Sequence, residues 1–171
     1  MVDIVAPFKA FLEPWKEVKN LKGSLVDGLI YNEIGAVILA VITSLFESSV
    51  SATTSLSGVA NFAILILAPI GLLIISAIYY VTAKLFGGKG SFDKQTFLFG
   101  TVSLPIAIFT IIPIINFLAA LWSLVVYFFV LKETHNLSDL KTIAVELLPA
   151  IVIGIITAIV VISMLPSSLL V

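Results

Sequence analysis

Lysine is the only basic residue type in this chain of 171 residues, and its nine copies fall into three short segments. These segments alternate with connections that carry no lysine, at residues 47–58 and 112–116 and after Leu165. Short cytoplasmic loops of membrane proteins retain Lys and Arg, whereas translocated loops lose them. The pattern predicts a cytoplasmic N-terminus and an extracytoplasmic C-terminus. The three segments contain Lys9, Lys16, Lys19 and Lys22; Lys84, Lys89 and Lys94; and Lys132 and Lys141.

Five apolar runs lie around these lysine segments. Apolar residues make up 60% of the chain and charged residues 11%, far from the balance of a water-soluble domain. A spanning helix needs roughly 20 mostly apolar residues, and the runs lack the alternation of barrel strands. We therefore expect an all-α bundle of five transmembrane helices. They are predicted near Gly28 to Phe46, Val59 to Phe86, Gln95 to Ile112, Asn116 to Leu131 and Thr142 to Leu165.

Residues 1–27 are expected to form a cytoplasmic segment that precedes a membrane domain of residues 28–171. Apolar residues recur in the segment at three- and four-residue steps and charged residues take the other side, a pattern typical of an amphipathic helix at a membrane interface. Pro14 predicts a kink or two short helices. Two interpretations stay open: a surface for lipid or a partner, and plain packing against the bundle. The candidate surface residues are Phe8, Phe11, Trp15, Lys16 and Lys19.

Two carboxylates within the apolar runs are the candidate intramembrane functional residues. Glu33 and Glu146 each lie about one turn inside a predicted helix, at similar depth from the cytoplasmic side. Acids are expensive in hydrocarbon and need a reason to be there. A shared pocket would hold a proton between them or recruit a cation. The structural alternative is that each pairs with a lysine near the interface, namely Lys84, Lys132 or Lys141.

The remaining motifs argue against catalysis and bound cofactors. The chain has no cysteine and one histidine, His135, so it offers no cysteine or multi-histidine metal site and no triad that can be argued. The stretch 87–91 lacks the order of a phosphate-binding loop and is expected to be a turn. We expect no enzyme activity, no cofactor and no nucleic-acid partner. Gly154 and Ala158 form a small-residue pair that suits packing within the chain or a homo-oligomer.

Residues 84–149 carry a resemblance to a known family. The stretch from Lys84 through Gly87-Gly88-Lys89-Gly90 to Pro105 resembles the Yip1 family of five-span membrane proteins in its short prokaryotic form. So do the turn at residues 112–116, the Leu121-Trp122-Ser123 stretch and residues 131–138. The resemblance implies a cytoplasmic N-terminus and no known catalysis. Eukaryotic relatives bind Rab-type GTPases in vesicle trafficking, and this chain differs from them in its very short cytoplasmic N-terminal segment.

Two functional hypotheses follow. The first is a non-enzymatic scaffold in the cell membrane, with a cytoplasmic surface for protein partners or anionic lipid headgroups. The second is a small oligomeric transporter or channel that uses Glu33 and Glu146. Besides the N-terminal residues, the expected cytoplasmic surface comprises Lys84, Lys89, Lys94, Lys132 and Lys141.

Overall fold

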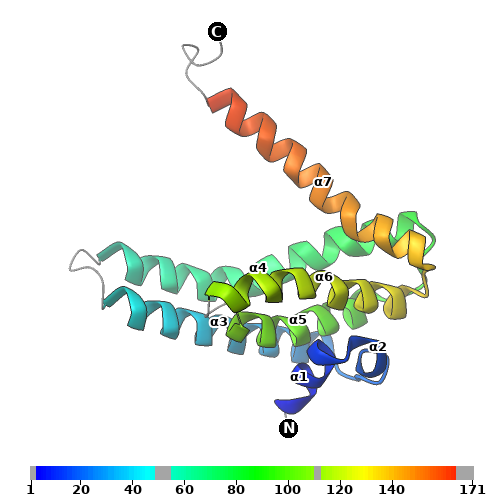
Figure 1. The fold of residues 1–171 in the computed structure, drawn as a ribbon, viewed down its shortest axis with the longest axis horizontal. Helices are drawn as coiled ribbons and strands as arrows, with labels where there is room; N and C mark the ends of the chain where they lie inside the picture. The colour runs from blue at the N-terminus through cyan, green and yellow to red at the C-terminus, as the bar shows by residue number, and fades with distance from the viewer. Residues whose placement is uncertain (1–2, 49–54, 110–112, 165–171) are drawn as a thin grey trace.

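The computed structural model describes residues 3–48, 55–109 and 113–164 of the chain. Helices α3 to α6 lie side by side as an elongated bundle, α1 and α2 lie on one side of it, and α7 diverges from it (Figure 1). The helices are α1 (Val5–Leu12), α2 (Pro14–Glu17), α3 (Leu25–Ser48), α4 (Ser55–Leu85), α5 (Phe92–Phe109), α6 (Pro113–His135) and α7 (Asp139–Met164).

Helices α3 to α7 correspond to the five predicted runs, and the expected all-helical class is confirmed for the described residues. By length and composition, three helices in this part of the chain can cross a membrane: Leu25–Leu45, Ala63–Leu85 and Ile115–His135. Helix α5 is shorter, with 18 residues, and its first turn contains Asp93, Lys94 and Gln95 after Phe92. The prediction of five crossings is therefore supported directly for three helices, and for α5 and α7 it stays a prediction.

Helix α5 forms the centre of the bundle. It packs against α1, α3, α4 and α6, and ten of its 18 residues are buried. Its buried residues include Gln95, Thr96 and Thr101, which need shielding from hydrocarbon. The neighbouring helices supply that shield, so α5 does not need the apolar surface of a lipid-facing span.

Glycines bring α3 and α5 into backbone contact. A Cβ added at Gly100 would overlap the carbonyl oxygen of Gly28, and one at Gly28 would lie 2.6 Å from the Cα of Phe97. Seven residues further along α3, a Cβ at Gly35 would lie 3.3 Å from the Cβ of Ala107. The two helices therefore run parallel in this register. Such small-residue seams allow the dispersion contacts that hold helices together in lipid.

The C-terminal ends of α4 and α6 close in the same way. After α4, Gly87 has φ of 86°, and the Gly88 amide donates to the carbonyl of Ala83 at 2.8 Å. After α6, Asn136 has φ of 52°, and the Leu137 amide donates to the carbonyl of Lys132 at 3.3 Å. Both are Schellman-type ends with a left-handed residue. The expected turn at 87–91 is confirmed at its first residues.

The break predicted in the N-terminal segment is confirmed. Helix α1 ends at Leu12, and α2 begins at Pro14, where the missing amide hydrogen costs nothing. Ala10, Phe11 and Val18 are buried in the main core. The segment thus packs on α5 and α6 and also keeps an exposed surface that includes Ile4 and Trp15.

We predict that Gly100→Ala lowers the stability of the fold by about 1–3 kcal/mol or more, because the new methyl meets the Gly28 backbone, which has no rotamer to change. The measurement is the midpoint of thermal unfolding in detergent, followed by circular dichroism.

Gly154→Ala is the matched control, because a Cβ at Gly154 has nothing within 4 Å. This change should be neutral or stabilise α7 by roughly 0.5–1 kcal/mol through helix propensity. Equal midpoints for Gly100→Ala and the unaltered chain would contradict the close contact of α3 and α5.

Candidate functional site

A chain of buried hydrogen bonds joins α4, α5 and α6 at the end of the bundle where α5 begins. The Gln95 side-chain amide donates from Nε2 to the carbonyl of Ser76 at 2.8 Å. Its Oε1 lies 2.7 Å from Nε2 of His135. Because an amide oxygen only accepts, Nε2 of His135 carries the proton and donates. All three residues are fully buried, so one amide side chain fixes the relative position of three helices.

The turn after α4 closes over His135. The Lys89 amide donates to the His135 carbonyl at 3.0 Å, and a Cβ at Gly88 would lie 3.0 Å from His135 Nδ1. The Tyr80 ring lies 5.9 Å from the imidazole, centroid to centroid. Nδ1 itself is buried without a hydrogen-bond partner. The histidine thus anchors the turn and is not exposed to a ligand.

Lys132 and Lys141 hold the α6–α7 turn at the end of the bundle where His135 lies. Lys141 Nζ donates to the carbonyl of Phe86 at 3.0 Å, and Lys132 forms an ion pair with Asp139 at 2.6 Å. The Lys84 ammonium lies 5.1 Å from the Tyr80 ring centroid. The α4–α5 and α6–α7 connections therefore form one continuous surface. On it Lys84, Lys89 and Lys141 are exposed, and Lys94 and Lys132 are partly exposed.

The structure divides the N-terminal candidates between surface and core. Phe11 is only 4% exposed and its ring stacks on Phe109 at 5.4 Å, so its assignment to a binding surface was wrong. Phe8 is half-buried. Trp15 is 45% exposed and meets the rings of Trp122 and Phe129 edge-on, at 6.3 Å each.

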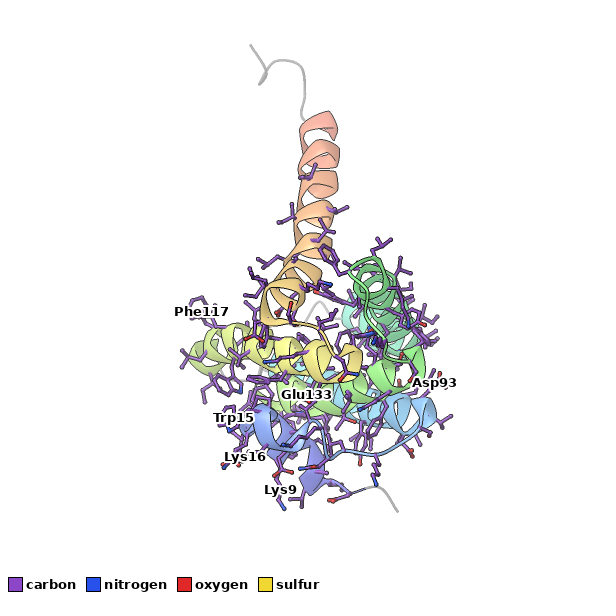
Figure 2. All side chains as sticks on the ribbon, turned by 90° about the vertical axis from the view of Figure 1, so that its right-hand side faces the viewer. Lys9, Trp15, Lys16, Asp93, Phe117 and Glu133 are labelled. Atoms are coloured by element: carbon purple, nitrogen blue, oxygen red, sulfur yellow. The ribbon has the colours of Figure 1, made fainter. Side chains whose placement is uncertain are left out.

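The charged members of the segment face solvent. Lys16 and Lys19 are both exposed, and Lys16 pairs with Glu13 at 3.1 Å. Figure 2 shows Lys9, Trp15 and Lys16 together on one side of the molecule. The amphipathic pattern therefore located the polar face correctly, whereas the apolar face is divided between bundle and surroundings.

The structure does not bring Glu33 and Glu146 together. Helix α3 packs on α5 and α4, whereas α7 packs on α6 and α4. Glu33 follows Gly28 by five residues, and Gly28 meets both Phe97 and Gly100, so Glu33 lies level with residues 102–105 of α5. This level lies about 10–15 Å further along α5 than Gln95.

Glu146 lies instead near the end of the bundle that holds Gln95 and His135. The Tyr79 hydroxyl donates to its backbone carbonyl at 3.5 Å, and Tyr79 is one turn from Ser76, the partner of Gln95. Each acid has a buried oxygen without a hydrogen-bond partner, Oε2 of Glu33 and Oε1 of Glu146. Within the described residues neither acid forms an ion pair with a lysine. The expected neutralisation by Lys84, Lys132 or Lys141 is therefore not seen there.

Sequence reasoning missed Gln95 and Ser76. The hydropathy pattern predicts Gln95 only as the first residue of a spanning run, and the composition raises His135 only as a metal ligand or catalytic base. The sequence did contain a signal, because Gln95 and His135 lie beside apolar runs. An amide or an imidazole is costly to bury without a hydrogen-bond partner. Within the described residues no cluster of three or more His, Cys, Asp or Glu suits a metal ion.

We predict that Gln95→Leu destabilises the fold by about 1–3 kcal/mol, because it leaves the buried His135 N–H without an acceptor. The double change Gln95→Leu/His135→Leu should recover part of this loss, since removing both partners leaves no unpaired donor. The measurement is thermal unfolding in detergent.

Ser123→Ala is a suitable control, because the Ser123 hydroxyl bonds only to a carbonyl of its own helix, that of Ala120. A Gln95→Leu variant no less stable than this control would contradict the role of the amide.

No curated protein and no solved structure matches the chain, but one protein-family model does. The family model described as the Yip1 domain matches residues 4–162, which is nearly the whole chain and includes the α1–α2 segment, the glycine seam and the Gln95–His135 pair. The chain therefore belongs to the Yip1 family of membrane proteins.

Proposed function

We propose that this Yip1-family protein is a non-enzymatic scaffold of the cell membrane, whose cytoplasmic end binds protein partners or anionic lipid headgroups. The observation that carries the proposal is the joining of the two lysine-bearing turns. The Lys89 backbone amide, in the α4–α5 connection, donates to the His135 carbonyl at the end of α6. The Lys141 side chain, at the start of α7, donates to the Phe86 carbonyl after α4. Charges far apart in sequence are thereby presented as one rigid surface.

The charge on this surface suits an acidic partner. Each lysine near an anionic membrane surface contributes roughly 1 kcal/mol of attraction. Lys84 and Lys89 are exposed, and neither forms an ion pair within the described residues. Their charges are therefore available to a partner.

The proposal includes five crossings, with the N-terminus inside and the C-terminus outside. Helices α3, α4 and α6 are apolar and long enough. Helix α5, shielded at the bundle centre, and α7, with exposed Leu147, Ile151 and Ile155, would supply the other two. This arrangement keeps every lysine on the cytoplasmic side.

We predict that reversing the exposed charges in Lys19→Glu/Lys84→Glu/Lys89→Glu removes the partners that co-purify from native membranes in mild detergent. The matched control is the corresponding triple change to arginine, which keeps the charge and should retain those partners. Mass spectrometry of both preparations measures the difference. Identical partners in the two variants would contradict a lysine-dependent surface.

Topology can be tested with single cysteines, because the chain has none of its own. We predict that a cysteine in place of Ser51 or Asn116 reacts with an impermeant maleimide in intact cells. One in place of Ser91 should react only after permeabilisation. Protection of the Asn116 position from both sides would show that the α5–α6 hairpin does not reach the outer face.

A transport function is the second candidate, favoured by the buried, unpartnered oxygens of Glu33 and Glu146. Because the two acids lie at different depths, each would act as a separate step along a pathway. Glu33→Gln and Glu146→Gln should then each abolish proton flux into liposomes that contain a pH dye, without loss of fold. Unchanged flux in both variants, or none in the unaltered protein, would exclude these acids as carriers.

A further inference from the structure

A cavity of about 410 Å³ lies between the start of α1, the chain that leads into α3, the first turns of α3 and the first half of α5. Three almost fully buried side chains form its floor: Tyr31, Phe97 and Thr101. Four polar side chains at or near the surface form its mouth: Asp3, Asn20, Lys22 and Asp27. The volume falls within the range of about 300–1,000 Å³ that is usual for small-molecule pockets. A ligand that enters at the mouth can therefore reach buried groups.

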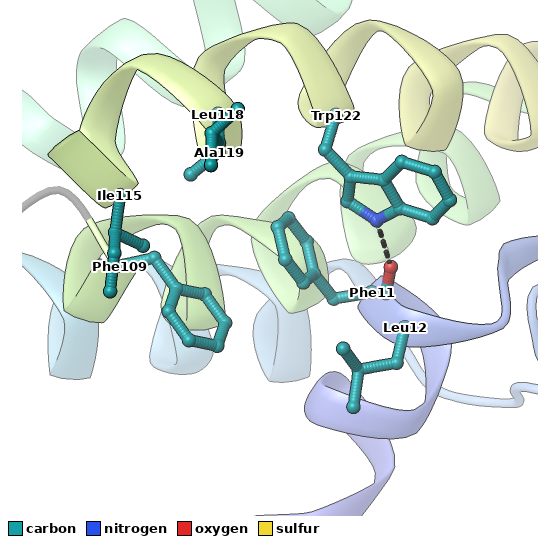
Figure 3. A pocket seen from close by; sticks show the side chains of 7 residues that line it. All are labelled: Phe11, Leu12, Phe109, Ile115, Leu118, Ala119 and Trp122. Atoms are coloured by element: carbon teal, nitrogen blue, oxygen red, sulfur yellow. Dashed lines mark hydrogen bonds between the residues drawn. The ribbon is translucent and has the colours of Figure 1, made fainter.

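Helix α1 forms one wall of the cavity and is held to the bundle near both ends. Before its start, the Asp3 carbonyl accepts a hydrogen bond from the Tyr31 hydroxyl at 3.0 Å. Near its end, the Phe11 carbonyl accepts one from the Trp122 indole N–H at 2.6 Å (Figure 3). The cavity is therefore bounded by elements that are bonded to one another, and its shape belongs to the fold.

The floor of the cavity offers a ligand hydrogen-bond acceptors. The Tyr31 hydroxyl has already donated its hydrogen to the Asp3 carbonyl. The Thr101 hydroxyl donates its own to the Phe97 carbonyl at 2.7 Å. A hydroxyl has one hydrogen and two lone pairs, so both oxygens can still accept but can no longer donate. A ligand that reaches the floor must therefore bring the hydrogens.

The mouth of the cavity also favours a donor. The Asp3 carboxylate accepts the Val5 and Ala6 amides at Oδ1, and Asp27 accepts the amide and hydroxyl of Ser24 at Oδ2. In the part of the chain that the structure describes, the second oxygen of each acid takes no hydrogen bond, and neither acid forms an ion pair. Lys22 is the one cation of the lining, so the lining carries a net negative charge.

These features select the chemical class of the ligand. An anion would meet two carboxylates and a floor without donors, whereas an organic ammonium supplies both the charge and the hydrogens. Among the described residues no cluster of three or more His, Cys, Asp or Glu suits a metal ion. The apolar part of the lining, Ala6, Leu21 and the Phe97 ring, suits a short hydrocarbon chain. Because acceptors lie at the floor and at the mouth, a chain with an ammonium group at each end uses both.

We propose that this cavity binds a short aliphatic diamine. One ammonium group lies at the hydroxyl oxygens of Tyr31 and Thr101, and the other lies at the carboxylates of Asp3 and Asp27. The site goes beyond the scaffold function and stands whether or not the lysine surface binds a partner.

The test is isothermal titration calorimetry of the full-length protein in a non-ionic detergent, with putrescine as the probe. The comparison ligand is permethylated putrescine, which has the same carbon chain and charge but quaternary nitrogens that donate no hydrogen bond. We expect saturable, one-to-one binding of putrescine and about tenfold weaker binding of the permethylated form. No saturable binding of putrescine, or equal affinities for the two ligands, would overturn the proposal.

Two variants show whether the binding takes place in this cavity. Thr101→Val removes an acceptor from the floor without changing the charge, and it should weaken putrescine binding by about tenfold. Asp3→Asn/Asp27→Asn should weaken it by roughly three- to thirtyfold, the loss of two partly exposed charge contacts. Asparagine keeps an oxygen that accepts helix amides, so we expect the thermal unfolding midpoint to stay the same.

Asp93→Asn is the matched control, because Asp93 lies in the first turn of α5 and outside the lining of the cavity. This variant should bind putrescine as the unaltered protein does. An affinity unchanged by Thr101→Val or by Asp3→Asn/Asp27→Asn would overturn the proposal, since putrescine would then bind elsewhere.

Discussion

The Gln95 side chain links helices that the surrounding hydrocarbon would not hold together by itself. In a bilayer, helix association gains little from the hydrophobic effect, so it depends on close packing and on polar bonds between helices. Gln95 supplies the polar bonds, to α4 through the Ser76 carbonyl and to α6 through His135. The contact of Gly28 with Gly100 supplies the close packing to α3. Helix α5 is therefore the element on which the other three are positioned.

The organisation of the end of the bundle that carries the two lysine-bearing turns follows from this arrangement. With α4 and α6 fixed to α5, their last residues lie close enough for the Lys89 amide to reach the His135 carbonyl. The left-handed residues Gly87 and Asn136 satisfy the last carbonyls of both helices. The lysines of these turns are held near one another without being buried, which is what a binding surface of fixed shape requires.

The N-terminal segment shows where pattern reasoning succeeds and where it stops. The break at Pro14 follows from the covalent structure of proline alone, and it is present. Periodicity also identified Phe11 as apolar and Lys16 as polar. It does not distinguish an apolar side chain that faces lipid from one that faces another helix, because both surroundings are equally apolar. Phe11 is therefore core, and Trp15 beside it is exposed.

Depth was misjudged for a related reason. Counting residues from a predicted boundary placed Glu33 and Glu146 at one level, but the height of each helix is set by contacts such as Gly28 with Gly100 and Tyr79 with Glu146, which join residues far apart in sequence.

The sequence by itself determined the helical class, the five long helices, the N-terminal break and the grouping of the lysines. Each of these follows from local hydropathy, proline chemistry or the distribution of charge along the chain. Only the tertiary structure decided that α5 is central and that Gln95 meets His135. The physical reason is that these features depend on the register between helices, which is fixed by the fit of small and polar side chains across contacts and leaves no periodic signal in the chain.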